Sequence, residues 1–472
     1  MFLTLLIAAF EGRKVITVDV PGAFLQAEMP SDKMILMKFT GKFVDYMCEV
    51  NKEHIPNVRR NKNGTKILYV RVLRALYGCI ESALQWYKLF KDTLEKEGYV
   101  LNPYDLCIAN KIENGKQITI AWYVDDCIIT HVDDEVLENV ADMLQKHFGK
   151  MDVKRGNKHD FLGINFTIRD DKKIEVEMKR AINESIEMFE KSGDKLSDEN
   201  VVSPARAHLF TVNPEGDQLG SERSDIFHSV VAKLLFITKR ARPDIETTQS
   251  FLCRRVSKSD EDDWKKLKRC LSFLKSTIDD VRVIGAGSLS DIYTWIDASY
   301  AVHDNLRSHT GGAISMGYDA HGIIHGKSSM QKLNVKSSTE AELVGVSEYI
   351  PYNIWLMMFL EAQGYGIKDN VIYQDNKSAI LMETNGRTSC TGNSRHINVR
   401  YFFVKDKIDK GEMRVEYLPT DLMIADYFTK PLNGNRFRIL REFIMGWRPM
   451  NSLKHVKMNC TTDTIKERVE NQ

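Results

Sequence analysis

Residues 118–129 read ITIAWYVDDCII and place two adjacent acids between two apolar runs of β-forming residues. This pattern predicts a β-hairpin with Tyr123-Val124-Asp125-Asp126 at its tip. A tight turn favours Asn-Gly or Asp-Gly, whereas two neighbouring carboxylates repel each other. A divalent cation relieves that repulsion, and a Mg²⁺ ion held by carboxylates is what nucleotidyl transfer requires. An ordinary acidic turn is the alternative for a pair that stands alone.

A third acid, Asp19, ends a short β-branched strand expected at residues 15–20, and PGAFL follows at residues 21–25. An acid at the end of an apolar strand usually indicates a turn or a sheet edge. Together with the hairpin at residues 118–129, Asp19 strengthens the case for a metal site.

These residues resemble the polymerase palm of copia-type retrotransposon reverse transcriptases. VDVPGAFL at residues 18–25 resembles the first catalytic motif of that family, and YVDD at residues 123–126 is its form of the second. The resemblance covers most of residues 1 to about 445 and continues in family order through further segments: Leu76-Tyr77-Gly78 with Trp86-Tyr87, Phe161-Leu162-Gly163-Ile164, Arg242-Pro243-Asp244-Ile245, Ser337-Ser338-Thr339-Glu340-Ala341-Glu342 and Ala425-Asp426-Tyr427-Phe428-Thr429-Lys430-Pro431-Leu432.

The resemblance implies a mixed α/β (α+β) chain in four parts. In order, they are a reverse transcriptase palm with truncated fingers, a thumb and connection, an RNase H-like domain and a polar tail, at residues 1–165, 166–285, 286–445 and 446–472. It also implies an RNA-directed DNA polymerase with ribonuclease H activity, which copies element RNA into DNA and degrades the RNA of the hybrid by two-metal catalysis. The implied partners are an RNA template, a DNA primer, an RNA/DNA hybrid and deoxynucleoside triphosphates. The implied cofactor is Mg²⁺, with Mn²⁺ as a substitute.

For the polymerase half, the resemblance assigns catalysis and metal binding to Asp19, Asp125 and Asp126. It assigns nucleotide and template contacts to Phe24, Tyr77, Gly78 and Tyr123. Phe24 lies five residues after Asp19, where related polymerases place an aromatic ring under the sugar of the incoming nucleotide. A rigid ring there leaves no volume for a 2′-hydroxyl, so it would exclude ribonucleotides. The alternative is that Phe24 is one more core aromatic.

For the second half, Asp297, Glu342, Asp375 and Asp426 each match a ribonuclease H motif position and are expected to hold two Mg²⁺ ions. Thr339-Glu340-Ala341-Glu342 is also a capping-box pattern, in which Glu342 would only bond the helix start. Glu340 and Glu342 are two positions apart, which is about 200° around a helix, so only one of these two glutamates can face the site. The resemblance selects Glu342. His396 lies where substrate contact is expected and is not counted as catalytic.

Bulk composition excludes few functions. The 472 residues are 43% hydrophobic and 28% charged, which is ordinary for a folded chain and argues against membrane spans. The net charge of +1 is uninformative, because an acidic face and a basic groove would cancel. Eight cysteines without a C-x-x-C pair indicate neither a zinc site nor a disulfide framework. An intracellular location, a cytoplasmic particle or the nucleus, is expected rather than secretion. The oligomeric state is left open.

Three helices are expected from local pattern. Residues 2–10 are apolar and predict a buried helix before the Asp19 strand, with a signal peptide as the alternative. Residues 133–149 show helical spacing with Asp at the start and Gly at the end. A third helix carries the apolar stripe Trp264, Leu267, Leu271 and Leu274. The opposite face of this helix is basic and carries Lys265, Lys266, Lys268 and Arg269. A solvated surface and a nucleic-acid duplex-binding track are equally good interpretations of this face.

The chain departs from the family pattern in two places. Residues 79–84 read CIESAL, without the basic residue and the proline that related chains carry there. Only 18 residues precede Asp19, so we expect the fingers segment that grips the triphosphate to be missing and polymerisation by this chain to be poor. The chain would then be the end of a polyprotein, a truncated element or a partial gene model. A catalytically inactive relic that only binds nucleic acid is the alternative function, and a two-metal nuclease with a vestigial polymerase half lies between them.

Overall fold

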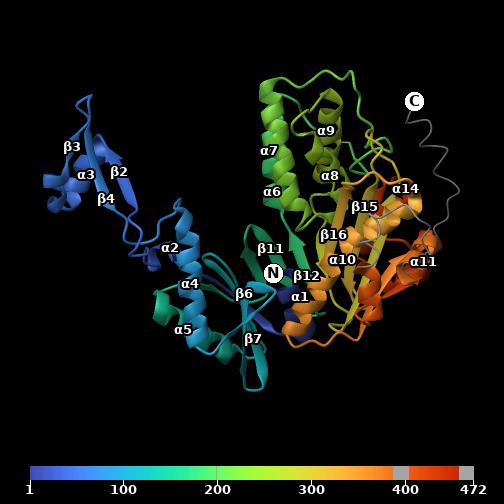
Figure 1. Cartoon of the computed structure of the whole chain (residues 1–472), viewed down its shortest axis with the longest axis horizontal. Coiled ribbons are helices and arrows are strands. Elements are labelled where there is room, and N and C mark those ends of the chain that lie inside the picture. The colour runs from blue at the N-terminus through green and yellow to red at the C-terminus, as the bar shows by residue number, and fades with distance from the viewer. Residues whose placement is uncertain (198, 386–402, 456–472) are drawn as a thin grey trace. The chain divides into compact units, whose positions relative to one another are not determined.

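The computed structural model describes residues 1–197, 199–385 and 403–455 (Figure 1). The chain divides into two compact units, one formed by Val15–Arg155 and the other by Met1–Lys14 together with Gly156–Gln472. Each unit has its own sheets and helices, and each is described by itself.

The Val15–Arg155 unit is built on a six-stranded sheet with the order β5-β6-β7-β8-β1-β9. Helices α2, α4 and α5 contribute to one apolar core with this sheet. A separate sheet of order β2-β4-β3 accompanies α3 and the 3-10 helix η1. The bounds are β1 Lys14–Asp19, α2 Ala23–Gln26, β2 Leu36–Thr40, α3 Lys42–Val50, η1 Lys52–Asn57, β3 Arg59–Arg60, β4 Lys66–Arg71, α4 Ile80–Lys96, β5 Val100–Asn102, β6 Asp105–Glu113, β7 Lys116–Tyr123, β8 Asp126–His131, α5 Asp134–Phe148 and β9 Asp152–Lys154.

The helix predicted at residues 133–149 is confirmed as α5. The Asp133 carboxylate accepts a hydrogen bond from the Glu135 amide at 3.0 Å, which satisfies one of the free N–H groups at the helix start. Gly149 follows the last turn with a positive φ of 88°, which a residue without a side chain adopts freely. The apolar stripe is buried against the core, so this helix supports the strands that carry the acidic hairpin.

The N-terminal helix α1, Phe2–Glu11, is buried along Leu3–Ala9, as predicted. It packs on β12, Ile174–Glu177, and therefore belongs to the second unit rather than to the predicted palm of residues 1–165. Residues 156–165 also group with the second unit, because β10 pairs with β11 there. The division into four domains otherwise stays a prediction.

The first part of the second unit is a four-stranded antiparallel sheet with helices. Helix α9 begins with a capping box between Asp260 and Asp263, and its predicted apolar stripe is buried. The bounds are β10 Lys158–Phe161, β11 Ile164–Ile168, β12 Ile174–Glu177, β13 Arg282–Ile284, α6 Lys179–Glu190, α7 Ser221–Thr238, η2 Pro243–Ile245, α8 Glu246–Arg255 and α9 Glu261–Ser276.

The rest of the second unit is a five-stranded mixed sheet of order β16-β15-β14-β17-β18. Strands β14, β17 and β18 run parallel, whereas β15 and β16 continue the sheet antiparallel. The bounds are β14 Asp291–Ser299, β15 His309–Met316, β16 His325–Met330, α10 Ser338–Ala362, β17 Asp369–Gln374, α11 Lys377–Asn385, β18 Arg414–Tyr417, η4 Thr420–Leu422, α13 Asp426–Thr429, α14 Gly434–Ile444 and η5 Met450–His455.

Two adjacent glycines on β15 show how helices cover both faces of this sheet. A side chain at Gly312 would collide with the Tyr349 ring of α10, at 2.4 Å, and one at Gly311 would collide with Phe428 and Thr429 of α13. Because neighbouring strand residues point to opposite faces, α10 and α13 lie on opposite sides of the sheet. The glycines therefore let both helices approach the strand that pairs with β14.

Within the described residues, α10 is the one helix long and apolar enough to cross a membrane by length and composition. It contacts β14 and β15, and 61% of its most apolar window is buried inside the protein. A core helix of a folded domain passes the same test, so its composition is weak evidence for a membrane span.

The Arg242-Pro243-Asp244 motif forms a buried ion network. Arg242 donates two hydrogen bonds of 2.9 Å to the Asp244 carboxylate, and Arg441 of α14 donates a third at 2.8 Å. Burial alone would raise the pKa of Asp244, but the two guanidinium groups lower it. Breaking a buried pair of this kind leaves an unpaired charge and costs about 3–5 kcal/mol. The motif therefore fixes α14, which follows the segment with Asp426, against the helices before the mixed sheet.

Candidate active sites

The acidic hairpin forms as predicted, with a refinement of its tip. Tyr123 pairs with Asp126, so Val124 and Asp125 are the two turn residues and Asp126 opens β8. The end of β1 lies beside this turn, since the Val20 amide donates to the Asp125 carbonyl at 2.9 Å. The sheet order therefore brings Asp19 to the same end of the sheet as the two hairpin acids.

Val124 holds the turn in an unfavourable conformation. Its φ is +57°, and two-residue hairpin turns of type II′, which need a positive φ at this first central position, normally have Gly there. For a β-branched residue a positive φ costs on the order of 1–3 kcal/mol and persists only where the surroundings enforce it. The Trp86 indole of α4 donates to the Val124 carbonyl at 2.6 Å and is itself buried. Trp86, which belongs to the family-like segment Trp86-Tyr87, thus holds the strained turn in place.

The carboxylates around this turn repel one another. The pKa of Asp19 is raised by loss of part of its hydration and by the negative charges of Asp125 and Asp152. Asp152 faces Asp19 across the antiparallel β1/β9 pair. Sequence analysis did not single out Asp152, because its only signal is one acid in a strand of three residues. The concentration of acids suits a cation with a preference for oxygen ligands.

The residues predicted to contact nucleotide or template lie beside Asp125. The Tyr77 hydroxyl lies 3.4 Å from Asp125 Oδ2, and the ring centroids of Tyr77 and Phe24 are 4.5 Å apart. Phe24, in α2, packs partly against the core. Gly78 has a φ of +93° in the turn before α4, and Tyr123 is exposed at the end of β7. These positions are compatible with the predicted roles, which stay predictions.

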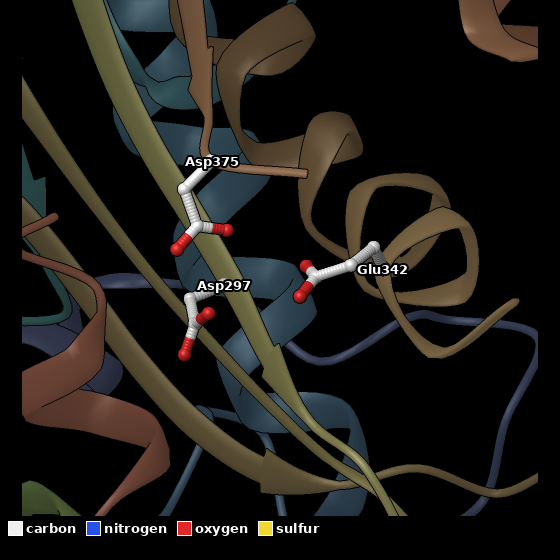
Figure 2. Close-up of side chains that lie close together, drawn as sticks. All are labelled: Asp297, Glu342 and Asp375. Atoms are coloured by element: carbon white, nitrogen blue, oxygen red, sulfur yellow. The ribbon is translucent and has the colours of Figure 1, made fainter. Parts of the chain in front are cut away.

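The second acidic group joins three separate elements (Figure 2). Asp297 lies on β14, Glu342 on α10, and Asp375 directly after β17. One carboxylate oxygen from each lies within 4.8 Å of the others. Because β14 and β17 are parallel, with Trp295 opposite Tyr373, continuing the register by two residues places Asp297 opposite Asp375. Glu342 completes the group from the first turns of α10.

Helix capping is separate from the site. Ser337 Oγ accepts from the Glu340 amide at 3.2 Å, and Glu340 Oε2 accepts from the Lys336 amide at 2.7 Å. Glu342 does not take part in that cap and points to the other acids (Figure 2). Its Oε2 is buried without a hydrogen-bond partner among the described residues. The geometry therefore agrees with Glu342, rather than Glu340, as the glutamate that faces the site.

Asp426 is not part of this three-acid group. Its carboxylate is engaged by Lys430 and by Arg436 of α14. Lys430 Nζ also lies 3.5 Å from Asp297 Oδ2, and the Thr429 hydroxyl donates to the same oxygen. The predicted fourth ligand is close to the group but neutralised by cations from its own segment. His396 lies outside the described residues.

Burial raises the affinity of these acids for protons. Burial and the charge of Asp426 raise the pKa of Asp297 to about 7. Burial and the charges of Asp297 and Asp375 raise the pKa of Glu342 well above its usual value. Three oxygen donors, two of them buried and one without a partner, match the coordination that Mg²⁺ or Mn²⁺ prefers. The residues present therefore fit a divalent cation.

These pKa shifts predict how pH changes stability. At Asp297 and Glu342 the folded state binds more protons than the unfolded state between about pH 4 and pH 7, so the contribution of these two carboxyl groups to folding stability falls as pH rises through that window. Above that window, a divalent cation bound at the three carboxylates would take the place of those protons. Thermal unfolding should therefore show a larger stabilisation by Mg²⁺ over EDTA at pH 8 than at pH 5.5, at matched ionic strength. Equal stabilisation by Mg²⁺ at both pH values would contradict the prediction that a divalent cation binds at these carboxylates.

The comparisons with known proteins agree with the polymerase motifs. The family model for reverse transcriptase (RNA-dependent DNA polymerase) matches residues 1–199. Residues 1–199 are therefore similar to a reverse transcriptase region. The chain is also 26% identical over 388 residues to the retrovirus-related Pol polyprotein of transposon TNT 1-94 from Nicotiana tabacum, and 26% identical over 442 residues to that of transposon RE1 from Arabidopsis thaliana. The predicted resemblance to a copia-type retrotransposon polyprotein is thereby confirmed.

These matches cover most of this chain but only part of each relative. The two alignments cover 81% and 89% of this chain but 28% and 26% of the plant polyproteins, so the chain spans about a quarter of the length of these relatives. A solved foamy viral protease-reverse transcriptase in complex with RNA/DNA hybrid aligns over 86% of this chain and 44% of its own, at 12% identity and a TM-score of 0.46.

Proposed function

We propose that the chain is an RNA-directed DNA polymerase with ribonuclease H activity. The reverse transcriptase family match supports polymerisation at Asp19, Asp125 and Asp126. The buried cluster of Asp297, Glu342 and Asp375 is the observation that supports the nuclease. The proposed partners are RNA template, DNA primer, RNA/DNA hybrid and deoxynucleoside triphosphates, with Mg²⁺ or Mn²⁺ as cofactor. We also propose an intracellular location.

The nuclease residues have distinct tasks in this proposal. Bound at the three carboxylates, a divalent cation would activate water and neutralise charge on the scissile phosphate. Glu342 brings toward that position an oxygen without a hydrogen-bond partner among the described residues, and Asp297 and Asp375 provide the facing pair from the adjacent strands β14 and β17. The Thr420 hydroxyl donates to Asp375 Oδ2 at 2.8 Å and thereby orients this half-exposed carboxylate. Such support keeps a ligand in position before binding.

The deciding experiment is cleavage of an RNA/DNA hybrid by the purified chain. We expect Mg²⁺-dependent cutting of the RNA strand, with single-stranded RNA and duplex DNA left intact. EDTA should abolish the activity, and added Mg²⁺ or Mn²⁺ should restore it. Hybrid that stays intact at every metal concentration would reject the nuclease half of the proposal.

A second candidate function is nucleic-acid binding without catalysis. The observation that favours it is the engagement of Asp426 by Lys430 and Arg436, which leaves three of the four predicted acids for metal. In that case the chain would bind the hybrid, and neither Mg²⁺ nor Mn²⁺ would produce cleavage. The hybrid experiment therefore distinguishes the two functions when binding and cutting are measured together.

Phe24 provides a test of the polymerase half. Replacing Phe24 with Val removes the ring whose centroid lies 4.5 Å from that of Tyr77, and opens space where a 2′-hydroxyl would otherwise clash. In primer extension by a polyprotein segment that includes this chain, we expect F24V to raise ribonucleotide use by one or two orders of magnitude, roughly 1–3 kcal/mol of discrimination. Deoxynucleotide use should change much less. Equal loss with both nucleotides would identify Phe24 as a packing residue.

A further inference from the structure

A basic pocket lies on the second unit, outside the acidic groups. It has a volume of about 310 Å³ and is formed by one face of α9 and the loop of residues 205–209. Four cations line it, with a histidine and one acid: Arg206, Lys265, Lys266, Arg269, His208 and Asp262. Lys266 pairs with Asp262 at 2.7 Å and donates to the Thr211 carbonyl at 2.6 Å. The acid of the pocket is therefore already neutralised.

The other three cations have no acidic partner in the part of the chain that the structure describes. Arg206 and Lys265 are exposed and make no ion pair there, and Arg269 makes one side-chain hydrogen bond, to Ser203 Oγ at 3.1 Å. Arg269 Nε is buried and has no hydrogen-bond partner among the described residues. Burial and the nearby positive charge of Arg206 lower the pKa of Arg269. A half-buried cation facing like charge is costly unless an anion neutralises it.

Two hydrogen bonds connect the pocket to Asn433, in the segment between Lys430 and Arg436. Ser203 Oγ, which accepts from Arg269, lies 2.8 Å from Asn433 Oδ1. Asn433 lies three residues after Lys430 and three residues before Arg436, the two cations that engage Asp426. The pocket therefore adjoins the segment whose cations engage Asp426.

We propose that this pocket binds a phosphate group of a nucleic-acid backbone. Guanidinium groups donate several hydrogen bonds in a planar fork, which matches phosphate oxygens, and Lys265 adds a mobile point charge. The pocket would hold the strand by its backbone and would read no base, since backbone contacts fix position rather than sequence. This assignment of the strand as ligand rests on the proposed function, whereas the binding of phosphate does not.

The first test uses inorganic phosphate and the wild-type chain. Lysine acylation followed by mass spectrometry reports the accessibility of each amine at constant ionic strength. We expect phosphate to slow acylation of Lys265 severalfold and to leave Lys172, an exposed lysine on the β11–β12 turn, unchanged. The double variant R206Q/R269Q should lose this protection. Equal acylation of Lys265 with and without phosphate would show a solvated basic surface only and would overturn the proposal.

The second test asks whether the phosphate belongs to a strand. Binding of RNA/DNA hybrid is measured in EDTA, where no cutting occurs, as a function of salt. R206Q/K265Q should weaken binding and reduce the slope of log K against log salt by about one to two units, because each lost phosphate contact releases about one counterion fewer. R180Q removes an exposed charge on α6 and should leave the slope nearly unchanged.

The outcomes of the two tests separate the pocket from the proposed function. If phosphate protects Lys265 but R206Q/K265Q keeps the wild-type salt slope, the pocket takes a free phosphate compound and the strand assignment is wrong. If the wild-type chain binds no hybrid at all, the proposed function fails, while the phosphate test still decides the pocket. Protection together with a reduced slope supports the full proposal.

Discussion

Glu342→Gln should lower Mg²⁺-dependent cleavage of the hybrid by at least about a thousandfold, on the order of 4 kcal/mol in the barrier. The amide has the size of the carboxylate but no charge, so it keeps the packing of α10 and loses a metal ligand. The buried Oε2 of Glu342 has no hydrogen-bond partner among the described residues, and its neighbours are acids. Neutralising it should therefore leave the metal-free fold equally or more stable.

The chain offers a matched control two residues away. Glu340 forms the cap at the start of α10, where its carboxylate accepts from the Lys336 amide and its amide donates to Ser337 Oγ. It takes no part in the three-acid group. Glu340→Gln removes the same charge from the same helix and should change the rate less than about threefold, at a cap cost of about 1 kcal/mol. Thermal unfolding of both variants checks that each is folded. Equal loss of cleavage in both variants would mean that the helix start, rather than metal binding, is what matters.

The features that could be predicted from sequence are those set by local pattern. The hairpin at Asp125 and helix α5 follow from alternation, helical spacing and end residues, all of which act within about fifteen residues. The selection of Glu342 over Glu340 follows from family resemblance, and helix geometry adds that one of them must face away. These features were therefore accessible before any tertiary contact was known.

The features that were missed depend on long-range packing or on side-chain choice. The two-residue strand Arg59–Arg60 pairs with β4 in a small sheet, and its own sequence has no apolar alternation that would predict a strand. Helix α1 groups with β12, about 160 residues away in sequence. The engagement of Asp426 depends on where the Lys430 and Arg436 side chains turn, which no spacing rule gives. The basic pocket needs an irregular loop packed on α9.

Asp125→Asn should abolish primer extension by a polyprotein segment that includes this chain, with a loss of at least about a thousandfold. Asp125 occupies the second turn position and lies beside both the end of β1 and the Tyr77 hydroxyl. An asparagine keeps the turn, because Asn is as acceptable as Asp in tight turns. Val124 and its clamp by Trp86 are untouched, so the geometry of the hairpin should survive.

The loss should come from the metal site and should be visible without catalysis. Asp125 and Asp152 both repel Asp19, and removing the charge of Asp125 should lower both that repulsion and the affinity for a divalent cation. Mn²⁺ titration followed by electron paramagnetic resonance should therefore show weaker binding in Asp125→Asn, together with an unchanged or higher unfolding temperature. Asp142→Asn, an exposed carboxylate on α5, is the control and should keep both extension and Mn²⁺ binding. Extension that persists in Asp125→Asn would place the polymerase metals elsewhere, whereas loss of extension with intact Mn²⁺ binding would assign Asp125 to substrate alignment.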